Sequence, residues 1–168
     1  KAAVTSEPIQ QIMSIKAPVS GVLFSSGEFQ ANTTIDDSKD LLIETELGFQ
    51  TNIDITQPVE PAEVYALIDC YYPMIEIASP NLEGKPNGVD LIASNSASFG
   101  FIKGDRIGFD TTDPDSVVAS LNRGNEALHF ANCSSVMGGQ SIALAWLINQ
   151  ILSREPLIPS NSLLMSGS

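Results

Sequence analysis

The fold is decided by one stretch of sequence, which runs Leu41-Leu-Ile-Glu-Thr-Glu-Leu-Gly-Phe49. Its residues alternate in polarity, so that an extended chain carries Leu47 and Phe49 on one face and Glu44 and Glu46 on the other. This period of two predicts a β-strand over residues 41–49. Two carboxylates therefore share one face of that strand.

A second apolar strand carries a third glutamate. Residues 74–78 read Met-Ile-Glu-Ile-Ala, and Glu76 interrupts them. Burying an unpaired carboxylate costs several kcal/mol, so such a residue is normally paired, protonated or bound to a metal ion. Glutamates two apart on a strand lie roughly 7 Å apart along one face, a spacing from which flexible side chains converge on one cation. Three carboxylates suit Mg²⁺ or Mn²⁺ better than zinc, which prefers His or Cys.

The alternative for residues 41–49 is an amphipathic surface strand whose Glu44 and Glu46 are simply solvated. On the alternation alone this arrangement is the commoner one, because half-exposed strands outnumber metal sites. Glu76 favours the metal site, since its strand shows no polar face that would explain a carboxylate there.

Short strands alternate with single helices in the rest of the chain, which predicts the α+β class. We expect a helix that starts at Ser6-Glu7-Pro8, a helix opened by Pro61 and stopped by Pro73, a short helix or turn within 90–98, and a buried helix over 141–153. The expected strands cover residues 1–4, 21–24 and 99–103. A hairpin is expected to join 116–121 to 126–133.

Composition limits the class of protein. Eight basic and 20 acidic residues give the 168-residue chain a net charge of −12, which excludes a nucleic-acid clamp built from clustered Lys and Arg. With 43% hydrophobic and 17% charged residues, the chain is expected to form one globular domain over 1–168. The longest apolar run, 142–148, is far shorter than the roughly 20 residues of a membrane span, so no membrane segment is expected.

The two cysteines, Cys70 and Cys133, lie far apart in apolar segments. They predict reduced core thiols in a reducing cytoplasm. The first residue is Lys rather than Met, and residues 162–168 end in a turn after a strand. We therefore expect the chain to lack terminal segments of a longer protein.

Short motifs spread over the whole chain resemble the fumarylacetoacetase superfamily. In order they are Lys1-Ala-Ala-Val-Thr-Ser6, Gln10-Gln11, Gly21-Val-Leu-Phe24, Ile43-Glu-Thr-Glu46, Pro73-Met-Ile-Glu-Ile77, Ala93-Ser-Asn-Ser96, Ala143-Leu-Ala-Trp-Leu147 and Leu164-Met-Ser-Gly167. The most specific part is the Glu-x-Glu of residues 44–46 followed by the Pro-x-x-Glu of residues 73–76. Within the superfamily, the chain is most similar to the branch of 2-hydroxypenta-2,4-dienoate (2-keto-4-pentenoate) hydratases and 4-oxalocrotonate decarboxylases.

The resemblance implies a fumarylacetoacetase-like mixed β-roll or sandwich with a few packed helices. It also implies a cytoplasmic homo-oligomer that acts on a small 2-oxo or 2-hydroxy acid. The implied site residues are Glu44, Glu46 and Glu76 as ligands of Mg²⁺ or Mn²⁺, Lys1 as the catalytic lysine, and Ser94, Asn95 and Ser96 as substrate-binding residues. The ion would act as a Lewis acid on the substrate's 2-oxygen and stabilise an enolate, while a lysine beside it suits general acid-base work.

The implied reaction is the hydration of a 2-hydroxy-2,4-dienoate, and the departures from the family pattern leave alternatives open. Val19 stands where hydratases carry the Asp of Pro-Asp-Phe-Gly, and residues 93–97 read Ala-Ser-Asn-Ser-Ala in place of Ala-Asp-Asn-Ala-Ser. Ser94 and Ala97 thus replace polar groups of the substrate-handling shell. A decarboxylase of the 4-oxalocrotonate type, an acylpyruvate C–C hydrolase and a metal-binding homologue without activity are the alternatives.

Three further features have ordinary explanations. His129 alternates with apolar neighbours and is expected on a wetter face, as a surface or hydrogen-bonded histidine. Gly138-Gly139 before a helix suits an anion site, although such a pair is more often a tight turn. The acidic loop with Asp105, Asp110, Asp113 and Asp115 lacks the spacing of an EF-hand, and solvation is expected.

Overall fold

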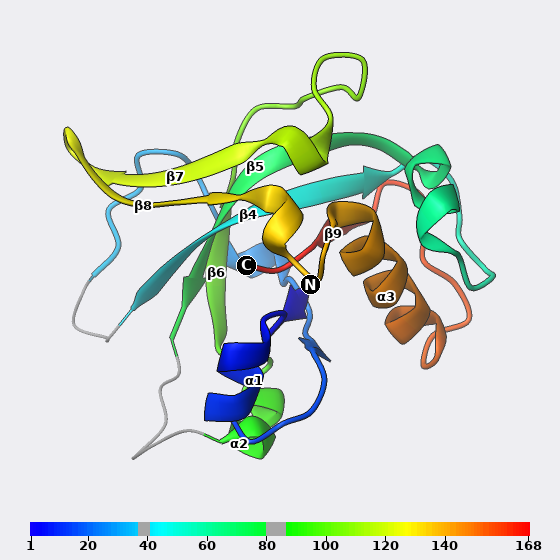
Figure 1. Cartoon of the computed structure of the whole chain (residues 1–168), viewed down its shortest axis with the longest axis horizontal. Helices are drawn as coiled ribbons and strands as arrows, with labels where there is room; N and C mark the ends of the chain where they lie inside the picture. The colour runs from blue at the N-terminus through cyan, green and yellow to red at the C-terminus, as the bar shows by residue number, and fades with distance from the viewer. Residues whose placement is uncertain (37–40, 80–86) are drawn as a thin grey trace.

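The computed structural model describes residues 1–36, 41–79 and 87–168. A five-stranded mixed sheet with the order β3-β6-β5-β4-β9 forms its centre (Figure 1). Its strands are β3 (Glu28–Phe29), β4 (Leu42–Thr51), β5 (Ile68–Ala78), β6 (Ser98–Lys103) and β9 (Leu163–Met165). Only the β3–β6 pair is parallel among the strands of this described sheet. The long strands β4 and β5 curve across the molecule and carry the predicted glutamates.

Two smaller sheets and three helices complete the described structure. β1 (Ala2–Ala3) pairs with β2 (Val19–Ser20), and β7 (Val118–Arg123) forms a hairpin with β8 (Glu126–Asn132). The α-helices are α1 (Glu7–Ile12), α2 (Gly88–Ala93) and α3 (Gln140–Leu152). The 3₁₀ turns are η1 (Ser25–Gly27), η2 (Pro61–Leu67), η3 (Pro114–Ser116) and η4 (Cys133–Ser135). The α+β class, the strand over 41–49, the hairpin and the helix over 141–153 are thereby confirmed.

The main core lies between the sheet and α3. Phe49 and Tyr71 from the sheet belong to the same buried cluster as Leu144, Leu147 and Ile148 from α3. Burial of each such side chain contributes about 1.5–3 kcal/mol to folding. This packing explains why α3 is apolar on nearly all sides, and it fixes β4 against a rigid support.

The predicted helix from Pro61 to Pro73 is wrong beyond Leu67. The chain forms the 3₁₀ turn η2 and then enters β5, which contains Pro73. Pro73 accepts a hydrogen bond from the backbone N–H of Gly104 at 2.9 Å, just past the end of β6. The carbonyl and the nitrogen of a strand residue point to the same neighbouring strand, so the nitrogen of Pro73 also faces the β6 side. The β5–β6 ladder ends at Met74 and Lys103, so no ladder hydrogen bond is lost because Pro73 has no N–H. The β-branched and aromatic residues of this stretch then favour a strand.

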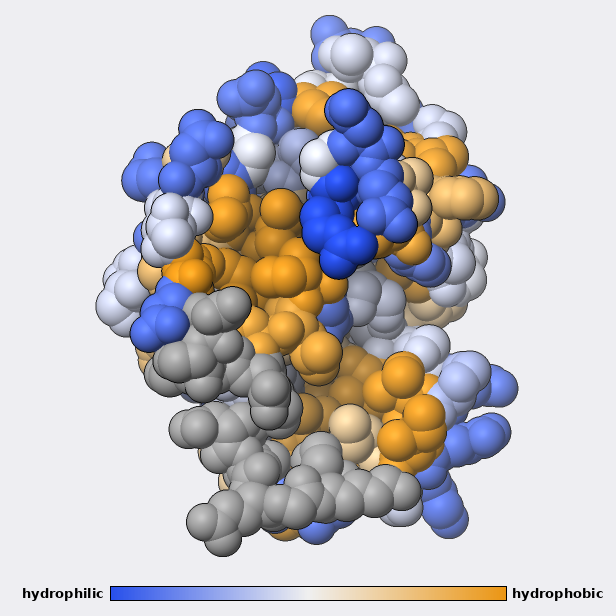
Figure 2. All heavy atoms as spheres, turned by 90° about the vertical axis from the view of Figure 1, so that its left-hand side faces the viewer, coloured by the Kyte–Doolittle hydropathy of each residue, from blue (hydrophilic) through white to orange (hydrophobic). Residues whose placement is uncertain are grey.

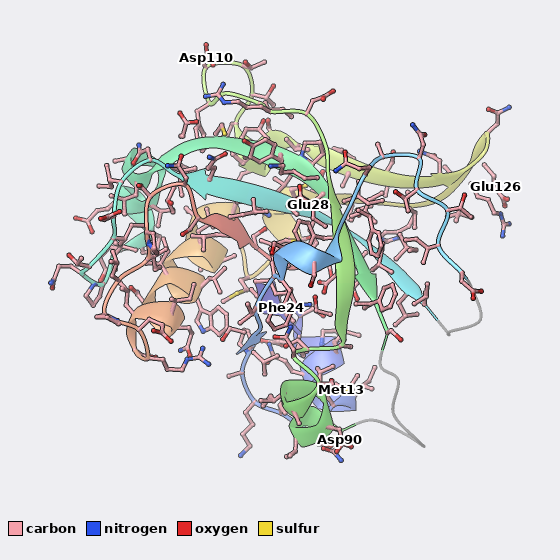
Figure 3. The ribbon with its side chains drawn as sticks, turned by 180° about the vertical axis from the view of Figure 1, so that it is seen from behind. Met13, Phe24, Glu28, Asp90, Asp110 and Glu126 are labelled. Carbon is pink, nitrogen blue, oxygen red and sulfur yellow. The ribbon has the colours of Figure 1, made fainter. Side chains whose placement is uncertain are left out.

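The expected strand over 21–24 is also wrong, because the pairing lies two residues earlier, in β2. Residues 21–24 are irregular and are held to the turn after α2 by the side chain of Asn95. Near them, α1 and α2 are neighbours: the backbone N–H of Gly88 donates to the carbonyl of Met13 at 2.8 Å. Figure 3 shows Met13 beside the helix that carries Asp90.

Other expectations about the chain were met within the described residues. Cys70 and Cys133 are buried free thiols, as predicted. No helix in the described ranges has the length and apolar character needed to cross a bilayer. The expectation of missing terminal segments and that of a homo-oligomer stay predictions.

Candidate metal centre

Three glutamate side chains converge on the β4–β5 ladder, near the end where β4 begins and β5 ends. Glu44 on β4 lies directly opposite Glu76 on β5, and Glu46 is two residues further along the same face of β4. Each carboxylate offers one oxygen, and the three oxygens all lie within 4.8 Å of one another. Among the described residues this is the one group of three potential ligands that meets this condition. The spacing read from the sequence thus produces the predicted cluster.

Burial makes the cluster electrostatically costly. Glu76 is 2% exposed and Glu46 is 4% exposed. Burial raises the pKa of the Glu46 carboxyl well above its usual range, and the negative charge of Glu76 adds to this effect. Burial also raises the pKa of Glu76, while the ammonium of Lys1 acts in the opposite direction. Burial therefore disfavours the charged forms of both carboxyl groups, and a bound cation would stabilise them.

Lys1 lies inside the cluster. It is 4% exposed, and its ammonium forms an ion pair with Glu76 and donates to the backbone oxygen of Ser96 at 3.2 Å. The ladder between β1 and β2 holds the adjacent Ala2 in place. The ammonium has three N–H groups, and these two contacts leave one for another partner. Lys1 is thus a buried residue, although a lysine at this position of the sequence would ordinarily be solvated.

The turn after β9 orients two of the carboxylates. The backbone N–H of Gly167 donates to Oε2 of Glu46 at 2.9 Å, and the hydroxyl of Ser168 donates to Oε2 of Glu44 at 2.5 Å. Gly167 has a φ of +96°, and a Cβ there would collide with the side chain of Thr5. In the sequence, residues 164–167 were noted only as one of the motifs that resemble the superfamily, and no role was predicted for them. Its contacts with the glutamates were not predicted, because they join residues more than 120 positions apart.

The three predicted substrate-binding residues lie in the turn after α2, with different surroundings. The side chain of Asn95 bonds to the backbone of Val22 twice, accepting from its N–H at 2.7 Å and donating to its carbonyl at 2.8 Å. The hydroxyl of Ser94 donates to the carbonyl of Leu91 at 3.0 Å. Ser96 is different, because its buried hydroxyl has no hydrogen-bond partner in the described structure and lines a cavity with Lys1. The substrate-binding role of all three stays a prediction.

Two of the altered family positions pack in one small cluster beside this cavity. Val19 and Ala97 belong to a small apolar cluster with Ala78 and Leu91. Ala97 lines the cavity directly. The hydrocarbon side chains at these positions provide packing and no hydrogen bond.

Two cavities flank the carboxylates. The smaller has a volume of about 310 Å³ and contains Lys1, Glu76 and Ser96 in its wall. The larger, of about 580 Å³, is lined by β4, the β7–β8 hairpin and the start of α3, and it includes Glu46. Glu44 lines both. Figure 2, which views the side toward which the hairpin extends, shows hydrophobic residues gathered around a hollow in that face. A small acid bound at the carboxylates would thus have space on either side.

The remaining candidates are explained by local structure. His129 is an exposed residue of β8 at the edge of the larger cavity. The backbone N–H at the start of α3, after Gly138-Gly139, donates to Oδ1 of Asp115 at 2.7 Å, so the anion bound there is a side chain of the chain itself. In Figure 3, Asp110 lies at the tip of an outward loop. Within the described residues, the acidic loop does not form a cluster of potential ligands.

The donor set fits a hard divalent cation. Three carboxylate oxygens and one ammonium leave two negative charges, which an ion such as Mg²⁺ or Mn²⁺ would balance. All three donors are oxygens, whereas zinc sites are built chiefly from nitrogen and sulfur.

Comparison with known proteins places this geometry in context. No family model matches the chain. The chain is 26% identical to the 2-hydroxyhexa-2,4-dienoate hydratase of Comamonas testosteroni over 179 residues, an alignment that covers 100% of the chain and 66% of the hydratase.

Solved structures agree with the fold. The 4-oxalocrotonate decarboxylase from Pseudomonas putida G7, complexed with magnesium and adipate, superposes with a TM-score of 0.91 at 22% identity, over 99% of this chain and 65% of the decarboxylase. The fumarylpyruvate hydrolase from Pseudomonas aeruginosa, in complex with Mn²⁺ and pyruvate, superposes with a TM-score of 0.73 at 9% identity, over 99% of this chain and 75% of the hydrolase. The chain thus spans just under two thirds of the hydratase and of the decarboxylase. The resemblance that the sequence motifs indicated is confirmed, and the chain has the fold of the fumarylacetoacetase superfamily.

Proposed function

We propose that the chain is the catalytic part of a divalent-metal-dependent lyase that hydrates a 2-hydroxy-2,4-dienoate. The observation that carries this proposal is the buried cluster of Glu44, Glu46 and Glu76 with Lys1 against it, between two cavities. The similarity to a dienoate hydratase over the whole chain supports the reaction class.

The three glutamates would hold Mg²⁺ or Mn²⁺. When bound, the ion would supply Lewis-acid polarisation of the 2-oxygen of the substrate. Gly167 and Ser168 hold the carboxylates of Glu46 and Glu44 in advance, so little reorganisation of these two would accompany binding.

Lys1 would move the proton. Its Nζ is fixed between Glu76 and the carbonyl of Ser96, and its remaining N–H is available to a substrate in the smaller cavity. An ammonium positioned in this way can donate a proton to the carbon chain and recover one from the 2-hydroxyl group. The buried hydroxyl of Ser96, which has no described partner, would bind a polar atom of the same substrate.

Decarboxylation of a 4-oxalocrotonate-type acid is the second candidate. It is favoured by the superposition on the decarboxylase at a TM-score of 0.91. Both reactions would use the same carboxylate cluster, so they differ in the substrate and not in the metal site.

The proposal is tested by turnover of three substrates in the presence of Mg²⁺ or Mn²⁺: a 2-hydroxy-2,4-dienoate, 4-oxalocrotonate and an acylpyruvate. We expect hydration of the dienoate, abolished by Glu76→Gln and retained by the surface control Glu126→Gln. Turnover of oxalocrotonate alone would favour the second candidate. If none of the three substrates reacts with the parent chain, the enzymatic proposal fails.

A further inference from the structure

The larger cavity contains one buried polar atom without a partner. Gln140, the first residue of α3, is 1% exposed and lines this cavity. Its Nε2 donates to the carbonyl of Cys133 at 2.6 Å, and its backbone N–H donates to Asp115 at 2.7 Å. Its Oε1 is buried and receives no hydrogen bond from any described group. A buried acceptor left in this state is costly, so the atom is expected to meet a donor from outside the chain.

The orientation of this amide is determined by its neighbour. The carbonyl of Cys133 can only accept a hydrogen bond, so the NH₂ group of Gln140 must face it. Oε1 is therefore the atom of this amide that has no partner among the described groups, in a residue that lines the cavity. A ligand that satisfies it must present an O–H or N–H group.

Part of the wall is suited to the uncharged part of a ligand. Hydrocarbon side chains from β4, from the hairpin and from the segment before α3 form this part, namely Ile43, Leu47, Ala119, Leu121 and Val136, and polar side chains such as His129, Asn132 and Ser135 line the cavity beside them. A carboxylate against the hydrocarbon groups would lose its water without gaining a partner. The carboxylate of Asp115, which bonds to the start of α3, would also repel it.

We infer that the larger cavity binds the uncharged tail of a 2-oxo monocarboxylic acid and that Oε1 of Gln140 accepts a hydrogen bond from a hydroxyl group on that tail. The inference rests on the proposed function, which places the 2-oxo acid group at Glu44, Glu46 and Glu76. In the hydration, the proton of the 2-hydroxyl group first moves to C5, which converts the C2=C3 and C4=C5 double bonds of the dienoate into a carbonyl group at C2 and a C3=C4 double bond. The oxygen of water then bonds to C4, this C3=C4 double bond is consumed, and one water proton ends on C3. The other proton stays on the new hydroxyl group and is donated to Gln140. Gln140 is thus a positioning residue for the added water and for the product.

The test measures binding rather than turnover. The full chain is titrated calorimetrically, with Mg²⁺ present, with 4-hydroxy-2-oxopentanoate, 2-oxopentanoate and the dicarboxylate 2-oxoadipate. We expect the hydroxylated acid to bind about 2- to 10-fold more tightly than 2-oxopentanoate, the range of one neutral hydrogen bond. We expect 2-oxoadipate to bind more weakly than both.

A variant separates Gln140 from other polar groups. In Gln140→Met, the ratio of the affinities for 4-hydroxy-2-oxopentanoate and 2-oxopentanoate should fall to about 1, while the affinity for 2-oxopentanoate stays unchanged. The matched control is Gln150→Met, the same replacement on α3 outside the wall of the larger cavity, which should keep the advantage. Thermal melting checks that both variants fold, and the comparison of ligands in the parent needs no variant.

The outcomes distinguish the two proposals. Equal binding of 4-hydroxy-2-oxopentanoate and 2-oxopentanoate by the parent overturns the role of Gln140 and leaves the proposed function standing. If 2-oxoadipate binds most tightly of the three acids, the inference that the larger cavity takes an uncharged tail is overturned. Failure of all three acids to bind overturns the proposed function and the inference together.

Discussion

Glu44 and Glu76 lie directly opposite each other in the antiparallel ladder of β4 and β5. Like charges in this relationship destabilise a sheet. The ammonium of Lys1 compensates part of the charge, and Glu46 adds to it from two residues away. An arrangement that is unfavourable for folding alone would become favourable if the three carboxylates held a divalent cation.

Replacing Glu46 by Gln should weaken Mn²⁺ binding by at least 10-fold, because one of three charged ligands is lost. The metal-free variant should be as stable as the parent or more stable, since a buried like charge is removed. Calorimetric titration with Mn²⁺ and thermal melting in EDTA measure the two effects. Glu126→Gln, at the exposed end of the hairpin, is the control and should change neither. Unchanged Mn²⁺ affinity in Glu46→Gln would disprove the ligand assignment.

Stability of the metal-free chain should fall as the pH rises. The pKa of Glu46 is raised in the folded state above its ordinary value of 4.5, so the folded chain holds a proton that the unfolded chain has lost at the same pH. Unfolding therefore releases this proton, and the free energy of unfolding decreases with pH from 4.5 up to the raised pKa. Melting temperatures in EDTA measured across this range should fall less steeply for Glu46→Gln than for the parent.

The same proton competes with the metal ion. Apparent affinity for Mg²⁺ should accordingly rise with pH over the same window, because the ion binds the deprotonated carboxylate. Titrations at several pH values test this. A pH-independent affinity would show that Glu46 is already ionised in the metal-free protein.

Replacing Lys1 by Met should abolish turnover while metal binding remains. The change leaves the buried Glu76 without its ammonium, and breaking a buried pair typically costs about 3–5 kcal/mol. Mn²⁺ should restore part of the lost stability, because the ion would balance the negative charge of Glu76 in place of the ammonium. Chemical denaturation with and without Mn²⁺ measures this difference. If Lys1→Met retains full activity, the lysine acts only in stability.

Gly167→Ala should disturb the metal site through the backbone. At φ +96° a side chain is strained by about 1–3 kcal/mol, and the new Cβ would also collide with Thr5. The N–H that holds Glu46 would move, so Mn²⁺ affinity should fall along with stability. Gly124→Ala is the matched control: it has φ +60° in the hairpin turn with open space around it. It should lower stability slightly and leave Mn²⁺ affinity unchanged.

The sequence by itself determined the strand of Glu44 and Glu46, the strand segment around Glu76 and the buried α3. In each case the information is local: a period of two or a continuous apolar surface fixes which residues face inward. The family resemblance added Lys1, because nothing in the residues next to Lys1 predicts that its side chain is buried or functional. The helix expected between Pro61 and Pro73 failed beyond Leu67, because the β-branched and aromatic residues that follow pair as a strand in the sheet.

Only the tertiary structure decided how these residues meet. The register that sets Glu44 opposite Glu76, the turn that brings Gly167 to Glu46, and the cavity that leaves Gln140 with a free oxygen all join residues distant in the chain. Such contacts depend on how strands pair and helices pack, so no periodicity in one segment contains them. The spacing within two strands therefore indicated the candidate ligands, and long-range packing determined the shape and polarity of the site around them.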